Sequence, residues 1–121
     1  MKIIQSKWPI YSEEEIDSVK SVLYSGNVNY WTGTQCRNFE KEFAKYVGVD
    51  YAVALSNGTV ALDLALLSLG IGKDDEVIVT SRTFIASVSC IVNVGATPVF
   101  ADVDLNTGNI TSKNISKVIS K

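Results

Sequence analysis

The sequence predicts an α/β fold in which a mainly parallel sheet is covered by helices on both faces, a three-layer αβα arrangement. Three observations favour this class. From about residue 51 onward, short apolar runs alternate with segments whose apolar residues recur every three or four positions. The runs at 76–80 and 98–101 are mostly apolar, as expected of strands buried on both faces. Glycines follow the helical segments and can end them. This order of elements is typical of β-α-β crossovers.

The amino-terminal elements are predicted by local signals. Ser12-Glu13-Glu14-Glu15 is a capping box and starts a helix that Gly26 can end in a left-handed conformation. Residues 27–34, "NVNYWTGT", have no period and predict a loop, and a second helix follows at about 35–47, closed by Gly48. The apolar faces expected to be buried comprise Ile16, Val19, Val22 and Leu23 on the first helix and Phe39, Phe43, Tyr46 and Val47 on the second.

The rest of the chain is predicted to alternate between strands and helices. The expected strands are at about 51–55, 76–80 and 98–102, and the expected helices at 58–69, 83–94 and 112–119. We therefore divide the chain into an amino-terminal helical segment, 1–48, and the first part of a larger domain, 49–121. A sheet of three parallel strands has an open edge with unpaired backbone groups, so we expect the sequence to be the front portion of a larger protein.

Composition narrows the classes of partner. The chain has 121 residues, of which 46% are hydrophobic and 20% charged, as in ordinary globular proteins. Its 11 basic and 13 acidic residues leave no broad cationic surface, so nucleic acid is not an expected partner. No apolar run approaches the roughly 20 residues that cross a bilayer. The sequence therefore predicts a cytoplasmic protein that does not insert into membranes.

Several kinds of chemistry are excluded by what the sequence lacks. It contains no histidine, which removes Ser-His and Cys-His nucleophiles and most catalytic zinc sites. Cys36 and Cys90 belong to no CxxC pair and are expected to be reduced thiols, so no metal site is predicted. Neither a P-loop nor a GxGxxG run is present, which leaves ATP or NAD binding by those motifs unsupported.

The candidate site is the turn Ser56-Asn57-Gly58-Thr59, which joins a predicted strand to a predicted helix. Ligands of open α/β sheets collect beyond the carboxyl ends of strands, where helix amino termini offer free amides and roughly half a positive charge. Gly58 lets a phosphate approach the backbone, Thr59 adds a hydroxyl, and Ser56 or Asn57 can cap the remaining amides. The same four residue types also cap ordinary helices, which is the alternative interpretation.

Two further turns follow the later strands. Phe84 opens the next predicted helix at the same sheet edge, where its ring could lie against a planar ligand, although a core position is the alternative. Asp102 and Asp104 flank the end of the third strand. They could act as acids or bases, but the segment 104–109 also has the composition of a solvated turn.

In combination, three blocks resemble the amino-terminal part of the DegT/DnrJ/EryC1/StrS family of sugar aminotransferases. They are "SGNVNYWTG", "FEKEFAKYVGVDYAVALSNGTVALDLALLSLGIGKDDEVIVTSRTFIASVSCIVNVGATPVFADVD" and "NTGNIT". The resemblance implies an incomplete large domain of a fold type I enzyme that uses pyridoxal 5'-phosphate and forms a homodimer. It also implies transfer of an amino group from glutamate to a nucleotide-linked keto sugar, in lipopolysaccharide, other polysaccharide or glycan biosynthesis.

The same resemblance assigns residues. Gly58 and Thr59 would contact the cofactor phosphate with Asn57 beside them, and Phe84 would stack on the pyridine ring. Tyr30 and Trp31 are candidate sugar contacts, with buried or interface aromatics as the alternative.

The family's catalytic lysine and the aspartate that pairs with the ring nitrogen belong to regions beyond this chain, so no catalytic residue is predicted and the chain is expected to be inactive alone. Two other functions stay open. One is a non-catalytic module for phosphate ligands or for protein interaction, and the weaker one is a nucleotide-binding Rossmann domain.

Overall fold

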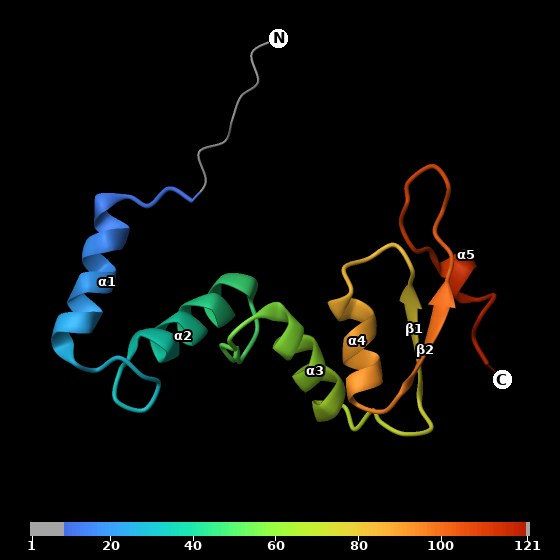
Figure 1. Ribbon diagram of the computed structural model, residues 1–121, viewed down its shortest axis with the longest axis horizontal. Helices are drawn as coiled ribbons and strands as arrows, with labels where there is room; N and C mark the ends of the chain where they lie inside the picture. Colours follow the sequence, from blue (N-terminus) through green and yellow to red (C-terminus); the bar gives the residue numbers. More distant parts are fainter. Residues whose placement is uncertain (1–8, 121) are drawn as a thin grey trace, which may run out of the picture. The chain divides into compact units, whose positions relative to one another are not determined.

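The structure is a computed structural model that describes residues 9–120. Its contacts divide the chain into two compact units, Met1–Ala54 and Leu55–Lys121, and each is described by itself. The expected domain boundary after residue 48 stays a prediction, since a compact unit is not the same thing as a domain. The elements are α1 (Glu13–Ser25), α2 (Gln35–Val47), α3 (Gly58–Ser68), β1 (Glu76–Thr80), α4 (Ala86–Asn93), β2 (Thr97–Ala101) and α5 (Ser112–Ile115) (Figure 1).

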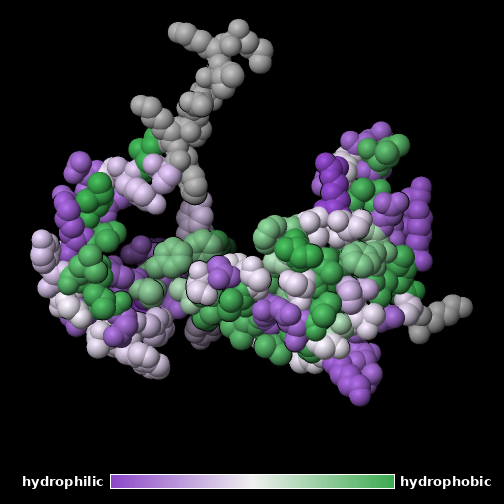
Figure 2. Space-filling model, in the orientation of Figure 1, coloured by the Kyte–Doolittle hydropathy of each residue, from purple (hydrophilic) through white to green (hydrophobic). Residues whose placement is uncertain are grey.

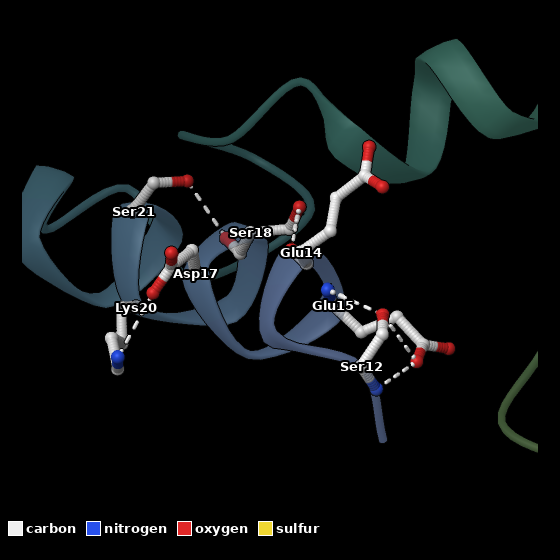
Figure 3. A network of polar contacts seen from close by, with 7 residues as sticks. All are labelled: Ser12, Glu14, Glu15, Asp17, Ser18, Lys20 and Ser21. Atoms are coloured by element: carbon white, nitrogen blue, oxygen red, sulfur yellow. Dashed lines mark hydrogen bonds and ion pairs between the residues drawn. The ribbon is translucent and has the colours of Figure 1, made fainter.

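Helix α1 begins at the predicted capping box. The Ser12 hydroxyl oxygen accepts from the Glu15 backbone N–H at 3.2 Å, and a Glu15 carboxylate oxygen accepts from the Ser12 backbone N–H at 2.6 Å (Figure 3). These bonds satisfy two amides that have no partner inside the helix. Further along, Lys20 and Asp17 form an exposed ion pair at 2.9 Å. Gly26 ends the helix with φ 70°, as predicted.

Helix α2 and the loop before it also lie where the sequence predicts them, and Gly48 ends α2 with φ 75°. The expected burial is wrong for both helices of the first unit. Ala44 is the one buried residue in α1 and α2. Ile16, Val19, Leu23, Phe39, Phe43, Tyr46 and Val47 are exposed, and Val22 is half-buried. An amphipathic face is buried only where another element covers it, and no element of the described first unit does so here.

The second unit holds a parallel pair of strands. β1 and β2 pair with Glu76 opposite Thr97 and Thr80 opposite Ala101. Helix α4 connects the two strands and packs on both of them, and it also packs on α3. The side-chain amide of Asn93 on α4 donates to a carboxylate oxygen of Asp63 on α3 at 3.3 Å. This β-α-β crossover with covering helices is part of the predicted αβα architecture.

The predicted strand at 51–55 is wrong. These residues form no strand, and the sheet of the described residues has two strands rather than three. A strand exists only where a neighbouring strand accepts and donates its backbone hydrogen bonds. Here the Ala54 N–H instead donates to a carboxylate oxygen of Glu40 at 2.9 Å, and Tyr51 and Val53 are exposed.

The buried core lies between the sheet and α4. Val79, Cys90, Ile91 and Ala96 form it, and Leu66, Ile71, Val77, Val88 and Val94 pack around it. Ile91 is the most enclosed of these residues, at 1% exposure. Apolar side chains are also open to solvent, as Figure 2 shows on its visible face. Leu62, Leu64 and Leu67 of α3 are exposed apolar residues of the second unit.

Two helices of the second unit are shorter than predicted. α4 begins at Ala86 rather than 83, because residues 83–85 form a turn in which the Phe84 carbonyl accepts from the Ser87 N–H at 3.0 Å. α5 ends at Ile115, and turns rather than α-helix follow it. Among residues 9–120, no helix has both the length and the apolar character needed to cross a membrane.

Candidate functional site

Asn57 sets the geometry of the turn that opens α3. Its backbone is extended, with φ −168° and ψ 170°, and its side-chain oxygen accepts from the Val60 N–H at 3.0 Å. Its carbonyl oxygen accepts from the Ala61 N–H at 3.2 Å. The amides of the third and fourth helical residues are therefore satisfied by Asn57 itself, as an N-cap residue does.

The first two amides of α3 are left free. Within the part of the chain that the structure describes, no hydrogen bond uses the N–H of Gly58 or of Thr59. A Cβ built on Gly58 would meet no atom within 4 Å, so the space in front of this backbone is open. The first turn of α3 carries no acidic residue that would oppose an anion. Free N–H groups at a helix start, with the helix dipole behind them, fit a phosphate group.

Phe84 lies in the same unit, after the carboxyl end of β1. It precedes α4 instead of opening it, because Ile85 is the N-cap residue of that helix. Its side chain is 73% exposed, which overturns the alternative of a core position. The hydroxyls of Thr83 and Ser87, which flank Phe84 in the sequence, form a hydrogen bond of 2.8 Å. The ring is thus available to a flat ligand.

Tyr30 and Trp31 belong to the other unit, in the loop between α1 and α2. Their rings meet edge to face with centroids 6.1 Å apart, and they are 43% and 82% exposed. The Asn29 side-chain oxygen accepts from the N–H groups of Trp31 and Thr32 at 2.9 and 3.0 Å. Gly33 completes the loop, because a Cβ there would lie 2.6 Å from the Asn27 carbonyl oxygen.

The sequence analysis missed Glu40 and Arg37, which hold this loop from α2. The Tyr30 hydroxyl donates to Glu40 at 3.1 Å, and the Arg37 guanidinium lies 5.2 Å from the centre of the Tyr30 ring. A charged residue on a helix is ordinarily a solvated one. Since the partners of Glu40 lie 10 and 14 residues away, no local pattern could have indicated its role.

Both aspartates after β2 accept hydrogen bonds from nearby backbone, and Asp104 forms a turn. Asp104 accepts from the N–H groups of Asn106 and Thr107 at 3.1 and 2.9 Å and from the Thr107 hydroxyl at 3.1 Å. These bonds, led by that from the Thr107 N–H, hold the pKa of Asp104 below its ordinary value of 3.8. Asp102 accepts from the Val103 N–H at 2.7 Å. Asp104 is therefore kept ionised by its own turn, which favours the structural interpretation over an acid role.

The two cysteines, Cys36 and Cys90, are free thiols, exposed and buried respectively. Within residues 9–120, no group of three or more histidine, cysteine or carboxylate side chains is placed to bind a metal ion.

Comparison with known proteins gives a consistent result. The model of the DegT/DnrJ/EryC1/StrS aminotransferase family matches residues 9–121. The spore coat polysaccharide biosynthesis protein SpsC of Bacillus subtilis (strain 168) is 44% identical over 112 residues, which are 93% of this chain and 28% of SpsC.

Two solved structures share the fold. An aminotransferase from Psychrobacter cryohalolentis matches with a TM-score of 0.92 and 58% identity, over 95% of this chain and 29% of that one. The PLP form of the sugar aminotransferase Spr1654 from Streptococcus pneumoniae matches with a TM-score of 0.86 and 36% identity, over 93% and 28%. The chain therefore spans under a third of the length of these relatives. The predicted fold class, part of a fold type I αβα domain, is confirmed by these neighbours.

Proposed function

This chain belongs to the DegT/DnrJ/EryC1/StrS aminotransferase family, and from that premise we propose that it forms part of an enzyme that transfers an amino group to a sugar. The cofactor of this family is pyridoxal phosphate, and solved relatives include forms with PLP and with PMP. The observation that carries the proposal in this chain is the pair of free amides at Gly58 and Thr59.

The proposal extends to the substrates. We place a nucleotide-linked keto sugar as acceptor and glutamate as donor, in the biosynthesis of a polysaccharide or related glycan. Support for a sugar destined for a polysaccharide comes from two relatives, one a protein of spore coat polysaccharide biosynthesis and the other a sugar aminotransferase. We also propose that the enzyme is a homo-oligomer and lies in the cytoplasm.

Each candidate residue, in either unit, has its own proposed task. The amides of Gly58 and Thr59 and the hydroxyl of Thr59 bind the cofactor phosphate, while Asn57 caps the helix start and leaves those amides free. Phe84 covers one face of the cofactor ring. Pyridoxal phosphate, when bound, supplies the electron-withdrawing ring through which amino groups are exchanged. Tyr30 and Trp31 contact the sugar.

We further propose that this chain alone is inactive, because none of its described lysines has the setting of a catalytic one. The six described lysines are all exposed: Lys20 on α1, Lys41 and Lys45 on α2, Lys73 in the turn before β1, and Lys113 and Lys117 in or just after α5. A lysine that reacts at neutral pH needs burial or a cationic neighbour to lower its pKa.

The proposal is tested by binding pyridoxal phosphate and pyridoxal to the 121-residue chain and to its Thr59→Val and Thr59→Ser variants. Pyridoxal phosphate should bind more tightly than pyridoxal, since only the former carries the phosphate. Thr59→Val should weaken the phosphate compound about tenfold, the effect of one hydrogen bond to a charged group, and Thr59→Ser should restore it. Thr97→Val, an exposed threonine at the start of β2, is the matched control and should change nothing.

Two outcomes count against parts of this account. Equal binding of both compounds would contradict the phosphate site. Borohydride trapping that places a stoichiometric adduct on one specific lysine would contradict the claim that the chain lacks its catalytic lysine. Binding of inorganic phosphate as tight as that of pyridoxal phosphate would instead favour the non-catalytic phosphate module.

A further inference from the structure

Glu40 joins two segments that are distant from each other in sequence. It lies on α2 and is half-buried. One carboxylate oxygen, Oε2, accepts from the Tyr30 hydroxyl at 3.1 Å, and the other, Oε1, accepts from the backbone N–H of Ala54 at 2.9 Å. A carboxylate has enough lone pairs for both donors, and hydrogen bonds to a charged acceptor are stronger than neutral ones.

The loop side of this contact is held by several further interactions. Tyr30 is held at its hydroxyl by Glu40 and at its ring by Arg37, whose guanidinium lies 5.2 Å from the ring centre. Arg37 also donates to the Trp31 carbonyl oxygen at 3.5 Å. Asn29 and Gly33 fix the rest of the loop, so the position of Trp31 depends on the anchorage of Tyr30 to α2.

The other side of the contact lies in the segment that was predicted to be a strand. Ala54 belongs to the predicted strand 51–55, and its N–H finds a side-chain acceptor in place of a strand partner. Ala54 is the last residue of the first unit, and the chain continues from it to the Asn57 turn. Glu40 therefore anchors the point where the chain leaves the first unit.

A pocket of about 300 Å³ lies beside this carboxylate. Tyr30, Glu40, Tyr51 and Ala52 are among the residues that line it. Glu40 bonds to the loop through one oxygen and to Ala54, two residues after Ala52, through the other, so it links two segments that contribute to this lining.

From these contacts we infer that Glu40 is a positioning residue, which holds the Tyr30–Trp31 loop and the segment ending at Ala54 in fixed positions against α2. That the loop contacts sugar rests on the proposed function. The anchorage itself does not, and it is measured below without any ligand.

The test uses four variants of the full chain: Glu40→Ala, Glu40→Gln, Tyr30→Phe and Glu42→Ala. Amide exchange at Ala54 reports one arm of the carboxylate. Acrylamide quenching of Trp31 fluorescence reports the other, with Trp8→Phe in every variant because the chain has two tryptophans. Glu42 is exposed on the same helix and serves as the matched control.

Glu40→Ala should speed Ala54 exchange about tenfold, the loss of one charge-assisted bond, and should increase Trp31 quenching. Glu40→Gln should restore both signals, since its amide accepts from Ala54 and donates to Tyr30. Tyr30→Phe should change only the Trp31 signal, and Glu42→Ala should change neither.

Unchanged Ala54 exchange in Glu40→Ala would overturn the inference, as would equal effects of Glu40→Ala and Glu42→Ala. Tyr30→Phe keeps the ring and removes only the hydroxyl, so it tests the loop arm even if Glu40→Ala fails to fold, and unchanged Trp31 quenching in Tyr30→Phe would also overturn the inference. A failure to bind pyridoxal phosphate would count against the proposed function and would leave these exchange results unaffected.

Discussion

Single residues cap the starts of α1 and α3. Ser12 and Asn57 both accept a hydrogen bond from the third helical N–H, and both were identifiable from the sequence because a cap and its partner are three positions apart. Their consequences differ. Ser12 belongs to a closed box in which Glu15 returns the bond, whereas Asn57 leaves two amides open.

Removal of the Ser12 hydroxyl should loosen the start of α1. Ser12→Ala deletes the oxygen that accepts from the Glu15 N–H, and loss of such a cap costs about 1 kcal/mol. Hydrogen exchange at the Glu15 amide should then be about fivefold faster. Ser18→Ala is the matched control, because the Ser18 hydroxyl only donates to the Glu14 carbonyl within the helix. Equal exchange in the two variants would contradict this role of Ser12.

The capping box should also respond to pH. Hydrogen bonds from the Ser12 backbone N–H and hydroxyl hold the pKa of Glu15 below its ordinary value of 4.5. A group whose pKa is lowered by folding stabilises the folded helix above that ordinary value, and the contribution is lost as pH falls through the lower, folded pKa.

The measurement is an NMR titration of the Glu15 carboxylate, together with exchange at the amides that begin α1, from neutral pH to below 4.5. The Glu15 midpoint should lie below its ordinary value of 4.5. In Glu15→Gln, the change in exchange at low pH should disappear. A Glu15 midpoint at or above 4.5 would show that the box does not form in solution.

At the scale of elements, features set by neighbouring residues could be predicted from the sequence, whereas features set by contacts between distant segments could not. The bounds of α1, α2 and β1 follow from caps, glycines and an apolar run that are contiguous in sequence. The apolar run at 51–55 looked the same as that of β1, but a strand also requires a partner, and β1 has one where 51–55 does not. The face of α2 was wrongly expected to be buried for the same reason.

The packing of α4 against the strands should account for most of the stability of the second unit. Ile91 is 1% exposed, so Ile91→Ala should cost about 2–5 kcal/mol of unfolding free energy, and Ile91→Val about 1 kcal/mol. Urea denaturation of the 121-residue chain measures both. Val92→Ala, on the exposed side of the same helix, should change the free energy by less than about 0.5 kcal/mol. Equal costs at the two positions would contradict this core.

For the whole molecule, the candidate site was predicted in part. The free amides after Asn57 follow from the residue types of that helix start, although the strand predicted before it does not form, and Phe84 was indicated by its place after β1 and by the family resemblance. What the sequence could not indicate is the carboxylate of Glu40, because its partners are joined to it only by folding. The account thus depends on two sets of backbone amides. The Ala54 amide is satisfied by Glu40, and the Gly58 and Thr59 amides are the set left open for a ligand.

The most direct test of the open set is an NMR titration of the 121-residue chain with pyridoxal phosphate and, separately, with pyridoxal. If the start of α3 receives the phosphate, the amide signals of Gly58 and Thr59 should shift with the phosphate compound and stay in place with pyridoxal. The Val60 amide, already bonded to Asn57, should shift less. Signals of Gly58 and Thr59 that do not move with pyridoxal phosphate, or that move equally with both compounds, would contradict the central claim.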